Sequence, residues 1–151
     1  MKKIKVAVNG YGVIGKRVVE AVTLQDDMEL VGVGDVAADW RIKVADAKGY
    51  PLFANTEEGR KAMNEQNISV AGDLDDMLSK ADLVVDCAPA KFGAKNAEKY
   101  KLAGIKYIVQ GGEKHEATGH SFSAENNYSS AINRESTRVV SCNTTSIVRT
   151  L

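Results

Sequence analysis

The sequence has few of the residues that mark disordered or disulfide-rich chains. Its 151 residues include two prolines and two cysteines, and aromatic residues make up 6%. The low proline content, with no biased tract, argues against long disordered segments. Two cysteines are too few for a disulfide scaffold, so we expect a reducing compartment, the cytoplasm. The length suits one domain.

The chain also lacks an excess of charge and a long apolar run. Lysine plus arginine and aspartate plus glutamate each number 20, which gives a formal net charge of zero. Nucleic-acid-binding proteins usually carry a basic excess, so we expect no nucleic-acid partner. The longest apolar stretches, such as residues 83–85, are far shorter than the roughly 20 residues that span a bilayer, and we expect no membrane partner.

Short β-branched runs alternate with helical patterns along the chain. Strands are predicted at residues 4–8, 29–33, 68–70, 83–87, 105–109 and 138–140. Helices are predicted at residues 13–23, 39–48, 57–65, 73–80 and 92–103, with a helix start at 146–151. Residues 113–136 are polar and give no clear pattern. The alternation predicts an α/β fold of the Rossmann type, a doubly wound, mostly parallel sheet with helices on both faces.

A glycine-rich turn follows the first predicted strand directly. Gly10, Gly12 and Gly15 form a G-x-G-x-x-G pattern that opens the predicted helix at 13–23. Gly10 permits the tight turn, Gly12 lets a pyrophosphate approach the backbone, and Gly15 lets the helix pack close to the strand. The helix N-terminus offers free N–H groups to phosphates. We interpret the turn as a dinucleotide site, with a purely structural turn as the alternative.

An acid follows the second predicted strand, where such folds hold the adenosine ribose. Asp35 would accept hydrogen bonds from the ribose hydroxyls and repel a 2′-phosphate, which favours NAD over NADP. A solvated loop acid is the alternative. NADP stays open, because Arg41 or Lys43 would reach a 2′-phosphate if the loop folds back.

A cysteine near the end of the chain lies among hydroxyl side chains. Cys142 falls between a predicted strand and a helix start, and a helix N-terminus favours the thiolate form. A thiolate is a strong nucleophile toward an aldehyde, and the hydroxyls and N–H groups around it suit an oxyanion or a phosphate. A buried, inert Cys142 is the alternative. Cys87 lies in an apolar strand, and we expect it to pack in the core.

The other polar residues give weaker signals. His115 and His120 lack the spacing of a metal site, so we expect surface positions for both and no bound metal. Gln110, Gly111 and Gly112 follow a predicted strand at the carboxyl edge of the sheet, where ligands bind in such folds. A plain turn explains these three residues equally well.

Together these features resemble the N-terminal, cofactor-binding half of an archaeal-type glyceraldehyde-3-phosphate dehydrogenase. The similarity covers nearly the whole chain in the order of that family, at residues 6–18, 25–33, 48–50, 82–86, 110–114 and 138–145. The last two segments are much more specific than the glycine turn. The resemblance implies oxidation of glyceraldehyde 3-phosphate with phosphate and NAD or NADP, giving 1,3-bisphosphoglycerate.

The resemblance also assigns roles to single residues. It makes Cys142 the nucleophile, which forms a hemithioacetal and then a thioester that phosphate cleaves. Substrate-binding positions correspond to Ser141, Asn143 and Thr144. Asp35 matches the ribose-binding acid of NAD-specific bacterial and eukaryotic relatives, whereas many archaeal members have other residues there. The cofactor-binding positions correspond to Gly10, Gly12, Val13, Ile14, Gly15, Asp35, Gly111 and Gly112.

Finally, the resemblance implies how the chain is divided. Residues 1–140 would form the dinucleotide-binding domain, and residues 141–151 the nucleophile turn and the start of a helix leading to a catalytic domain that the chain lacks. That domain supplies the histidine base, the phosphate sites and most contacts of the family's homotetramers. We therefore expect the chain alone to be inactive. A non-catalytic NAD-binding module, or half of a related semialdehyde-type dehydrogenase, remains an alternative.

Overall fold

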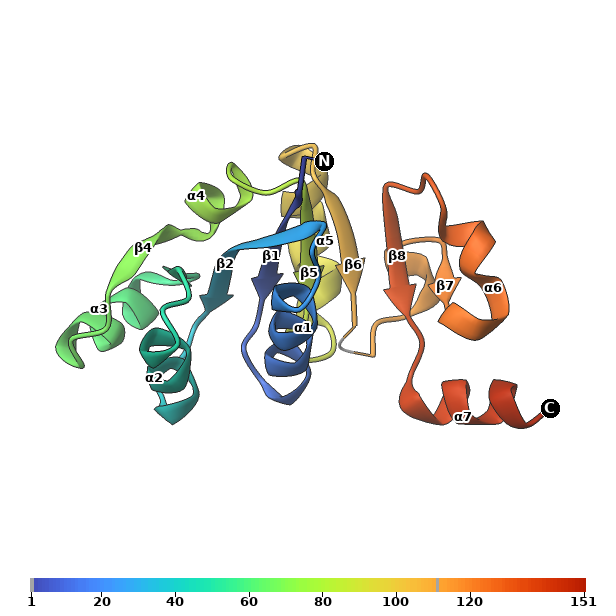
Figure 1. Ribbon diagram of the computed structural model, residues 1–151, viewed down its shortest axis with the longest axis horizontal. Helices are drawn as coiled ribbons and strands as arrows, with labels where there is room; N and C mark the ends of the chain where they lie inside the picture. Colours follow the sequence, from blue (N-terminus) through green and yellow to red (C-terminus); the bar gives the residue numbers. More distant parts are fainter. Residues whose placement is uncertain (1, 111) are drawn as a thin grey trace.

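A single parallel sheet forms the centre of the part of the chain that the computed structural model describes, residues 2–110 and 112–151. The strand order is β4-β3-β2-β1-β5-β6-β8-β7, and all neighbouring pairs are parallel (Figure 1). The strands are β1 (Ile4–Asn9), β2 (Met28–Asp35), β3 (Leu52–Ala54), β4 (Val70–Asp73), β5 (Leu83–Asp86), β6 (Lys106–Val109), β7 (Ser121–Phe122) and β8 (Ser136–Val139).

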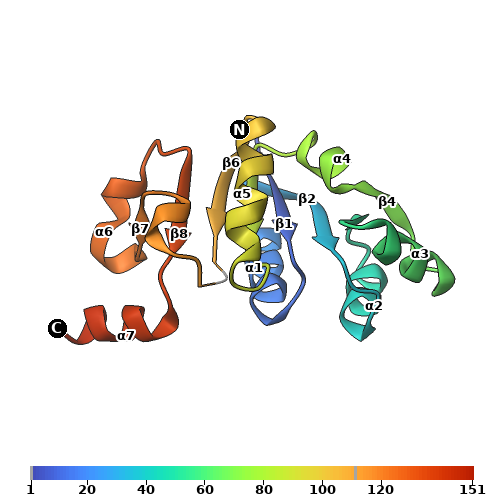
Figure 2. The same cartoon turned by 180° about the vertical axis from the view of Figure 1, so that it is seen from behind.

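Helices cover both faces of this sheet, so the predicted doubly wound α/β fold is confirmed. Helix α1 lies in front of the sheet in Figure 1, and α5 lies in front of it in the reverse view of Figure 2. The helices are α1 (Val13–Thr23), α2 (Trp40–Ala47), α3 (Glu57–Glu65), α4 (Leu74–Leu78), α5 (Phe92–Leu102), α6 (Ala124–Ala131) and α7 (Cys142–Thr150), with a 3₁₀ turn, η1, at His115–Ala117.

The first strand shows why its sequence is a continuous apolar run. Val6 and Val8 pack in clusters with residues of α1, such as Val19 beside Val8. Ala7, between them, packs in the cluster on the other face, with Tyr100 of α5. Successive side chains of a strand point to opposite faces, so a strand covered on both faces needs apolar residues at every position.

The structure differs from the sequence-based expectation at β3, at β4 and in residues 113–136. Strand β3 was not predicted, because three residues are too few to show a periodicity. Strand β4 begins at Val70, although a strand was predicted at 68–70; Ile68 lies before it and is buried in the core. The polar residues 113–136, which give no pattern in the sequence, contain η1, β7 and α6.

A buried polar network joins the carboxyl ends of β1, β3 and β5. Asp86 Oδ2 accepts hydrogen bonds from the Tyr100 hydroxyl at 2.5 Å, from Asn96 Nδ2 at 2.9 Å and from Asn9 Nδ2 at 3.3 Å. Asn55 Nδ2 donates to Asn9 Oδ1 at 2.6 Å. Asp86 is 0% exposed, so neutral donors stabilise its carboxyl group away from water. The network therefore connects Asn9, the residue just before Gly10, to β5 and to Asn55.

Replacing Tyr100 with phenylalanine tests the strength of this network. Burial is the main cause that raises the pKa of the Tyr100 hydroxyl, which therefore stays protonated and donates to Asp86. Tyr100→Phe should lower the free energy of unfolding by about 1.5–3 kcal/mol, because a hydrogen bond to a carboxylate is lost. Urea denaturation measures this difference.

Tyr107 provides the matched control. It is buried, its ring centre lies 5.6 Å from that of Tyr100, and among the described residues its hydroxyl has no hydrogen-bond partner. Tyr107→Phe should therefore leave stability unchanged or raise it. Equal losses in the two variants would show that the Asp86 hydrogen bond contributes little.

Candidate functional site

The glycine turn has the tight geometry that its sequence predicts. Gly10 has a φ of +95°, and its N–H donates to the Gly34 carbonyl at 2.7 Å. A Cβ on Gly10 would lie 3.0 Å from the backbone nitrogen of Ala88, after β5. A Cβ on Gly15 would overlap the Gly10 carbonyl oxygen. Side chains at these two positions would therefore push α1 and the loop after β5 away from the turn.

The first turn of α1 lies open beside the glycine turn. Gly12 is the N-cap residue and provides no side-chain cap. Val13 and Ile14 are 77% and 48% exposed, although both are apolar. Their backbone N–H groups belong to the end of the helix that carries the positive partial charge. The local structure therefore fits the pyrophosphate of a dinucleotide.

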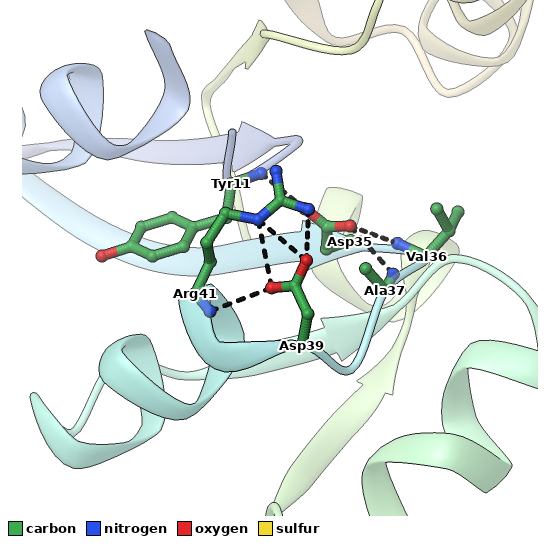
Figure 3. A network of polar contacts seen from close by, with 6 residues as sticks. All are labelled: Tyr11, Asp35, Val36, Ala37, Asp39 and Arg41. Atoms are coloured by element: carbon green, nitrogen blue, oxygen red, sulfur yellow. Dashed lines mark hydrogen bonds and ion pairs between the residues drawn. The ribbon is translucent and has the colours of Figure 1, made fainter. Parts of the chain in front are cut away.

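Asp35, the last residue of β2, is bonded to the glycine turn itself. Its Oδ2 accepts a hydrogen bond from the backbone N–H of Tyr11 at 2.7 Å. Its Oδ1 accepts from the N–H groups of Val36 at 2.8 Å and Ala37 at 2.9 Å (Figure 3). The carboxylate therefore holds the end of β2 against the glycine turn. The sequence does not show this structural role.

An ion pair at the start of α2 lies close to the same turn. Asp39 caps the helix by accepting from the Arg41 N–H at 2.9 Å, and its carboxylate also accepts from Nε and Nη2 of Arg41 (Figure 3). The hydrogen bond to Arg41 lowers the pKa of Asp39 and raises that of Arg41. A Cβ on Gly12 would lie 3.8 Å from Arg41 Nη1. Lys43 is exposed on the same helix.

Cys142 is the first residue of α7 and is exposed. The predicted helix start at 146 is wrong by four residues, because Ser141 caps the helix and its Oγ accepts from the Thr144 N–H at 3.1 Å. The Cys142 sulfur lies 3.9 Å from Asn143 Oδ1. The alternative of a buried Cys142 is thus wrong, and the thiol is accessible at a helix N-terminus.

The loop after β6 packs near the loop after β5. Gly111 lies outside the described residues. Gly112 has a φ of +80°, and a Cβ there would lie 4.0 Å from Ala90 Cβ. Glu113 is buried, and its Oε1 accepts from the Gly93 N–H at 3.0 Å in the first turn of α5. The sequence did not identify this contact, which fixes the loop against α5.

The two histidines occupy different environments. His115 is exposed, as predicted, with Nδ1 2.9 Å from Ser121 Oγ. His120 is buried, so its predicted surface position is wrong. Thr137 Oγ1 at 2.6 Å and Ser130 Oγ at 2.9 Å satisfy its two ring nitrogens, and burial lowers its pKa. Burial of the ring costs little when both nitrogens have hydroxyl partners.

Two kinds of feature are absent from residues 2–110 and 112–151. Within those ranges no helix is long and apolar enough to cross a membrane. The same ranges hold no group of three or more His, Cys, Asp or Glu side chains that could bind a metal ion.

The strand order, the glycine turn after β1 and the acid at the end of β2 define the class of NAD(P)-binding dehydrogenase domains. A family model described as dihydrodipicolinate reductase, N-terminus, matches residues 4–144. The chain belongs to this family, and its sequence is also similar to those of archaeal glyceraldehyde-3-phosphate dehydrogenases.

Two archaeal relatives show the extent of this similarity. Glyceraldehyde-3-phosphate dehydrogenase of Methanothermobacter thermautotrophicus is 51% identical over 148 residues, which cover 98% of this chain and 44% of the relative. The enzyme of Archaeoglobus fulgidus is 51% identical over 150 residues, which cover 99% of this chain and 44% of the relative. The chain therefore spans less than half the length of these relatives.

The fold is also similar to solved structures. The WlbA dehydrogenase from Bordetella pertussis, in complex with NADH and UDP-GlcNAcA, matches with a TM-score of 0.54 and 24% identity. The match covers 72% of this chain and 27% of that one. At this level of identity the likeness concerns the fold alone.

The two cysteines should differ in their reactivity. Cys87 is half-buried and packs on the core, and burial, with a smaller effect from the Asp86 charge, raises its pKa to about 12. At neutral pH it is a thiolate about a thousandfold less often than an ordinary cysteine with a pKa near 8.5. Iodoacetamide should therefore label the exposed Cys142 much faster than Cys87 in the folded chain, which peptide mass spectrometry can follow.

The variants Cys142→Ser and Cys87→Ser each leave one cysteine, so each labelling rate can be assigned to one residue. Unfolding in urea should make the two labelling rates equal, because both thiols are then exposed to solvent. Faster labelling of Cys87 in the folded chain would contradict the packing described here.

Proposed function

We propose that the chain is the cofactor-binding half of a phosphorylating glyceraldehyde-3-phosphate dehydrogenase and that it binds NAD at the glycine turn. The observation that carries the proposal is the 2.7 Å hydrogen bond from the Tyr11 N–H to Asp35. This bond fixes an open helix N-terminus and a ribose-binding acid next to each other. A dinucleotide uses both groups, the helix N-terminus for its pyrophosphate and the acid for its ribose.

The adenosine half of the cofactor would contact the ends of β1 and β2. The backbone N–H groups of Val13 and Ile14 would bind the pyrophosphate, with Gly12 leaving room for its approach. Asp35 would accept a ribose hydroxyl, and its charge favours NAD over NADP. On the nicotinamide side, the family resemblance adds Gly111 and Gly112, in the loop after β6.

Cys142 would carry the covalent step. Its thiolate attacks the aldehyde carbon of glyceraldehyde 3-phosphate and forms a carbon–sulfur bond, and the carbonyl oxygen takes up a proton to give a hemithioacetal. When bound, NAD would supply the hydride acceptor for the hemithioacetal carbon, and the hydroxyl proton would pass to a base. The oxidised carbon is then a thioester, which inorganic phosphate cleaves to 1,3-bisphosphoglycerate and the free thiolate. Ser141, Asn143 and Thr144 flank the thiol and would bind the substrate.

This chemistry also needs a base that holds and returns the proton. His115 lies against Ser121, His120 lies between Thr137 and Ser130, and among the described residues neither histidine is hydrogen-bonded to Cys142. We therefore assign the base, the substrate-phosphate sites and the homotetramer contacts to the part of the relatives that this chain does not match. Loss of a base alone slows such reactions by about 10²–10⁴-fold. A cytoplasmic location belongs to the same proposal.

The first experiment combines binding with turnover. Calorimetry should detect NAD binding, and an absorbance assay with NAD, phosphate and glyceraldehyde 3-phosphate should detect no turnover by the chain alone. Turnover that Cys142→Ser abolishes would show that the chain holds a complete site. Absence of NAD binding would overturn the proposal.

Replacing Asp35 with alanine should weaken NAD binding by about tenfold to a hundredfold, since a hydrogen bond to a charged group is lost at the ribose. The preference for NAD over NADP should narrow, because the repulsion of the 2′-phosphate also disappears. Calorimetric titration with both cofactors measures the two effects.

Asp27→Ala is the matched control for this substitution. Asp27 is exposed and lies just before the amino end of β2, so the variant removes one negative charge at the opposite edge of the sheet. It should bind both cofactors like the unmodified chain. Unchanged NAD affinity in Asp35→Ala would remove Asp35 from the ribose site.

A further inference from the structure

His120 lies where three elements meet at the edge of the sheet. Its residue comes just before β7, the two-residue edge strand, and its carbonyl accepts from the Arg138 N–H of β8 at 3.1 Å. Its ring contacts Thr137 on β8 and Ser130 on α6. Figure 1 shows β7 and α6 beside β8, at the end of the chain that also carries α7. One side chain therefore connects the short edge strand, α6 and β8.

The hydrogen bonds of Ser130 determine which ring nitrogen of His120 carries the proton. The Ser130 hydroxyl donates to the Asn127 carbonyl at 2.8 Å, so it accepts from the histidine. Nε2 of His120, 2.9 Å away, is therefore the donor. Nδ1 of the neutral ring then accepts from the Thr137 hydroxyl at 2.6 Å. Among residues 2–110 and 112–151 that hydroxyl makes no other side-chain hydrogen bond.

A proton on Nδ1 disrupts this arrangement. The doubly protonated ring only donates, so the Nδ1–H and the hydrogen of the Thr137 hydroxyl would point into the same 2.6 Å gap. The hydroxyl hydrogen must then turn away and lose its acceptor, although Thr137 is only 8% exposed. A buried donor without a partner is unfavourable. The neutral ring is thus the form that fits these contacts.

The charged groups around the ring also favour its neutral form. Arg134, just after α6, and His115 of η1 lower the pKa of His120, after the larger effect of burial. On β8 a further cation, Arg138, donates to Ser121 Oγ at 2.7 Å. The acidic residues in or beside these elements pair with other side chains or are exposed: Glu125 pairs with Arg149, Glu135 pairs with Lys106, and Glu116 is exposed.

The elements that His120 connects also support the chain around Cys142. The N–H of Val140, two residues before the cysteine, donates to the Phe122 carbonyl of β7 at 3.1 Å. Helix α7, which begins at Cys142, is joined to α6 by an ion pair of 2.8 Å between Arg149 and Glu125. Movement of β7 and α6 away from β8 would therefore remove contacts on both sides of the cysteine.

We propose that His120 is a pH-sensitive positioning residue for this part of the chain. The neutral ring holds the β7–α6 segment (residues 121–131) on β8, and a proton on Nδ1 releases the segment and weakens the support of α7. The inference goes beyond the proposed function, because the contacts that carry it involve neither the glycine turn nor a cofactor.

Hydrogen exchange at different pH values tests the proposal. A released ring has an ordinary pKa near 6.5, whereas the ring in the closed segment has a lower pKa. Release therefore becomes easier as the pH falls below about 6.5 and is independent of this group at higher pH. Protection of the β7–α6 segment, corrected for the intrinsic exchange rate, should fall at least about threefold from about pH 8 to about pH 5.5, since each unit of pKa difference changes the equilibrium tenfold.

Two variants separate His120 from other titrating groups. His120→Gln cannot take up a proton, so protection of the segment should be the same at both ends of the pH range, whatever its absolute value. His115→Gln is the matched control, because His115 is exposed and has one serine contact. It should keep the pH dependence of the unmodified chain. A loss of protection in His120→Gln as large as that in the unmodified chain, or constant protection in the unmodified chain, would refute the proposal.

The ring itself can be observed if His120→Gln does not keep the segment folded. The chain has two histidines, so His115→Gln leaves His120 as the only one and its ring signals are assigned without ambiguity. NMR spectra of the ring nitrogens should show the proton on Nε2 at high pH and a titration midpoint below about 6.5. A proton on Nδ1, or a midpoint at or above that value, would contradict the proposed contacts. None of these results depends on NAD binding, so the proposed function is tested separately.

Discussion

Parallel alignment of β1, β2 and β5 is the constraint on which the candidate site depends, because it brings the carboxyl ends of three strands to one edge. Backbone groups at such an edge need hydrogen-bond partners once they are buried. Two aspartates provide them. Asp86 Oδ1 accepts from the Ala88 N–H while its Oδ2 binds side chains of β1 and α5, and Asp35 accepts from the Tyr11 N–H. The two aspartates thus connect the glycine turn to β2 and to the loop after β5.

The charged groups near the turn differ in how they are paired. Backbone N–H groups bind the Asp35 carboxylate, and no ion pair among residues 2–110 and 112–151 includes it. Asp39 and Arg41 neutralise each other, but the pair is about one-third exposed, so solvent screens it and its contribution to folding is small. Its effect is to orient the guanidinium.

Local signals explain most of what the sequence predicts correctly. The helices at 13–23 and 57–65 are predicted with the bounds that the structure shows. These features depend on residues a few positions apart. The same holds for the glycine turn, whose context is a strand on one side and a helix on the other.

The features that the sequence misses depend on contacts between distant residues or on very short elements. Tyr11 and Asp35 are 24 residues apart, and His120 and Thr137 are 17 apart, so no local pattern shows either hydrogen bond. The ribose role of Asp35, by contrast, was inferred from a motif and stays a prediction. Strand β3 has three residues and is identified only by its parallel neighbours β2 and β4.

The strand order also gives a direction to the proposed site. Asp35 ends β2, the glycine turn follows β1, Gly112 follows β6 and Cys142 follows β8, in the sheet order β2-β1-β5-β6-β8. Neighbouring strands lie about 4.8 Å apart, so the ends of β2 and β8 are roughly 19 Å apart. In the proposed function, Asp35 and Cys142 are therefore too far apart to contact the same part of a cofactor. A dinucleotide extended along the edge would reach both residues, with its adenosine at the end of β2 and its nicotinamide toward Cys142.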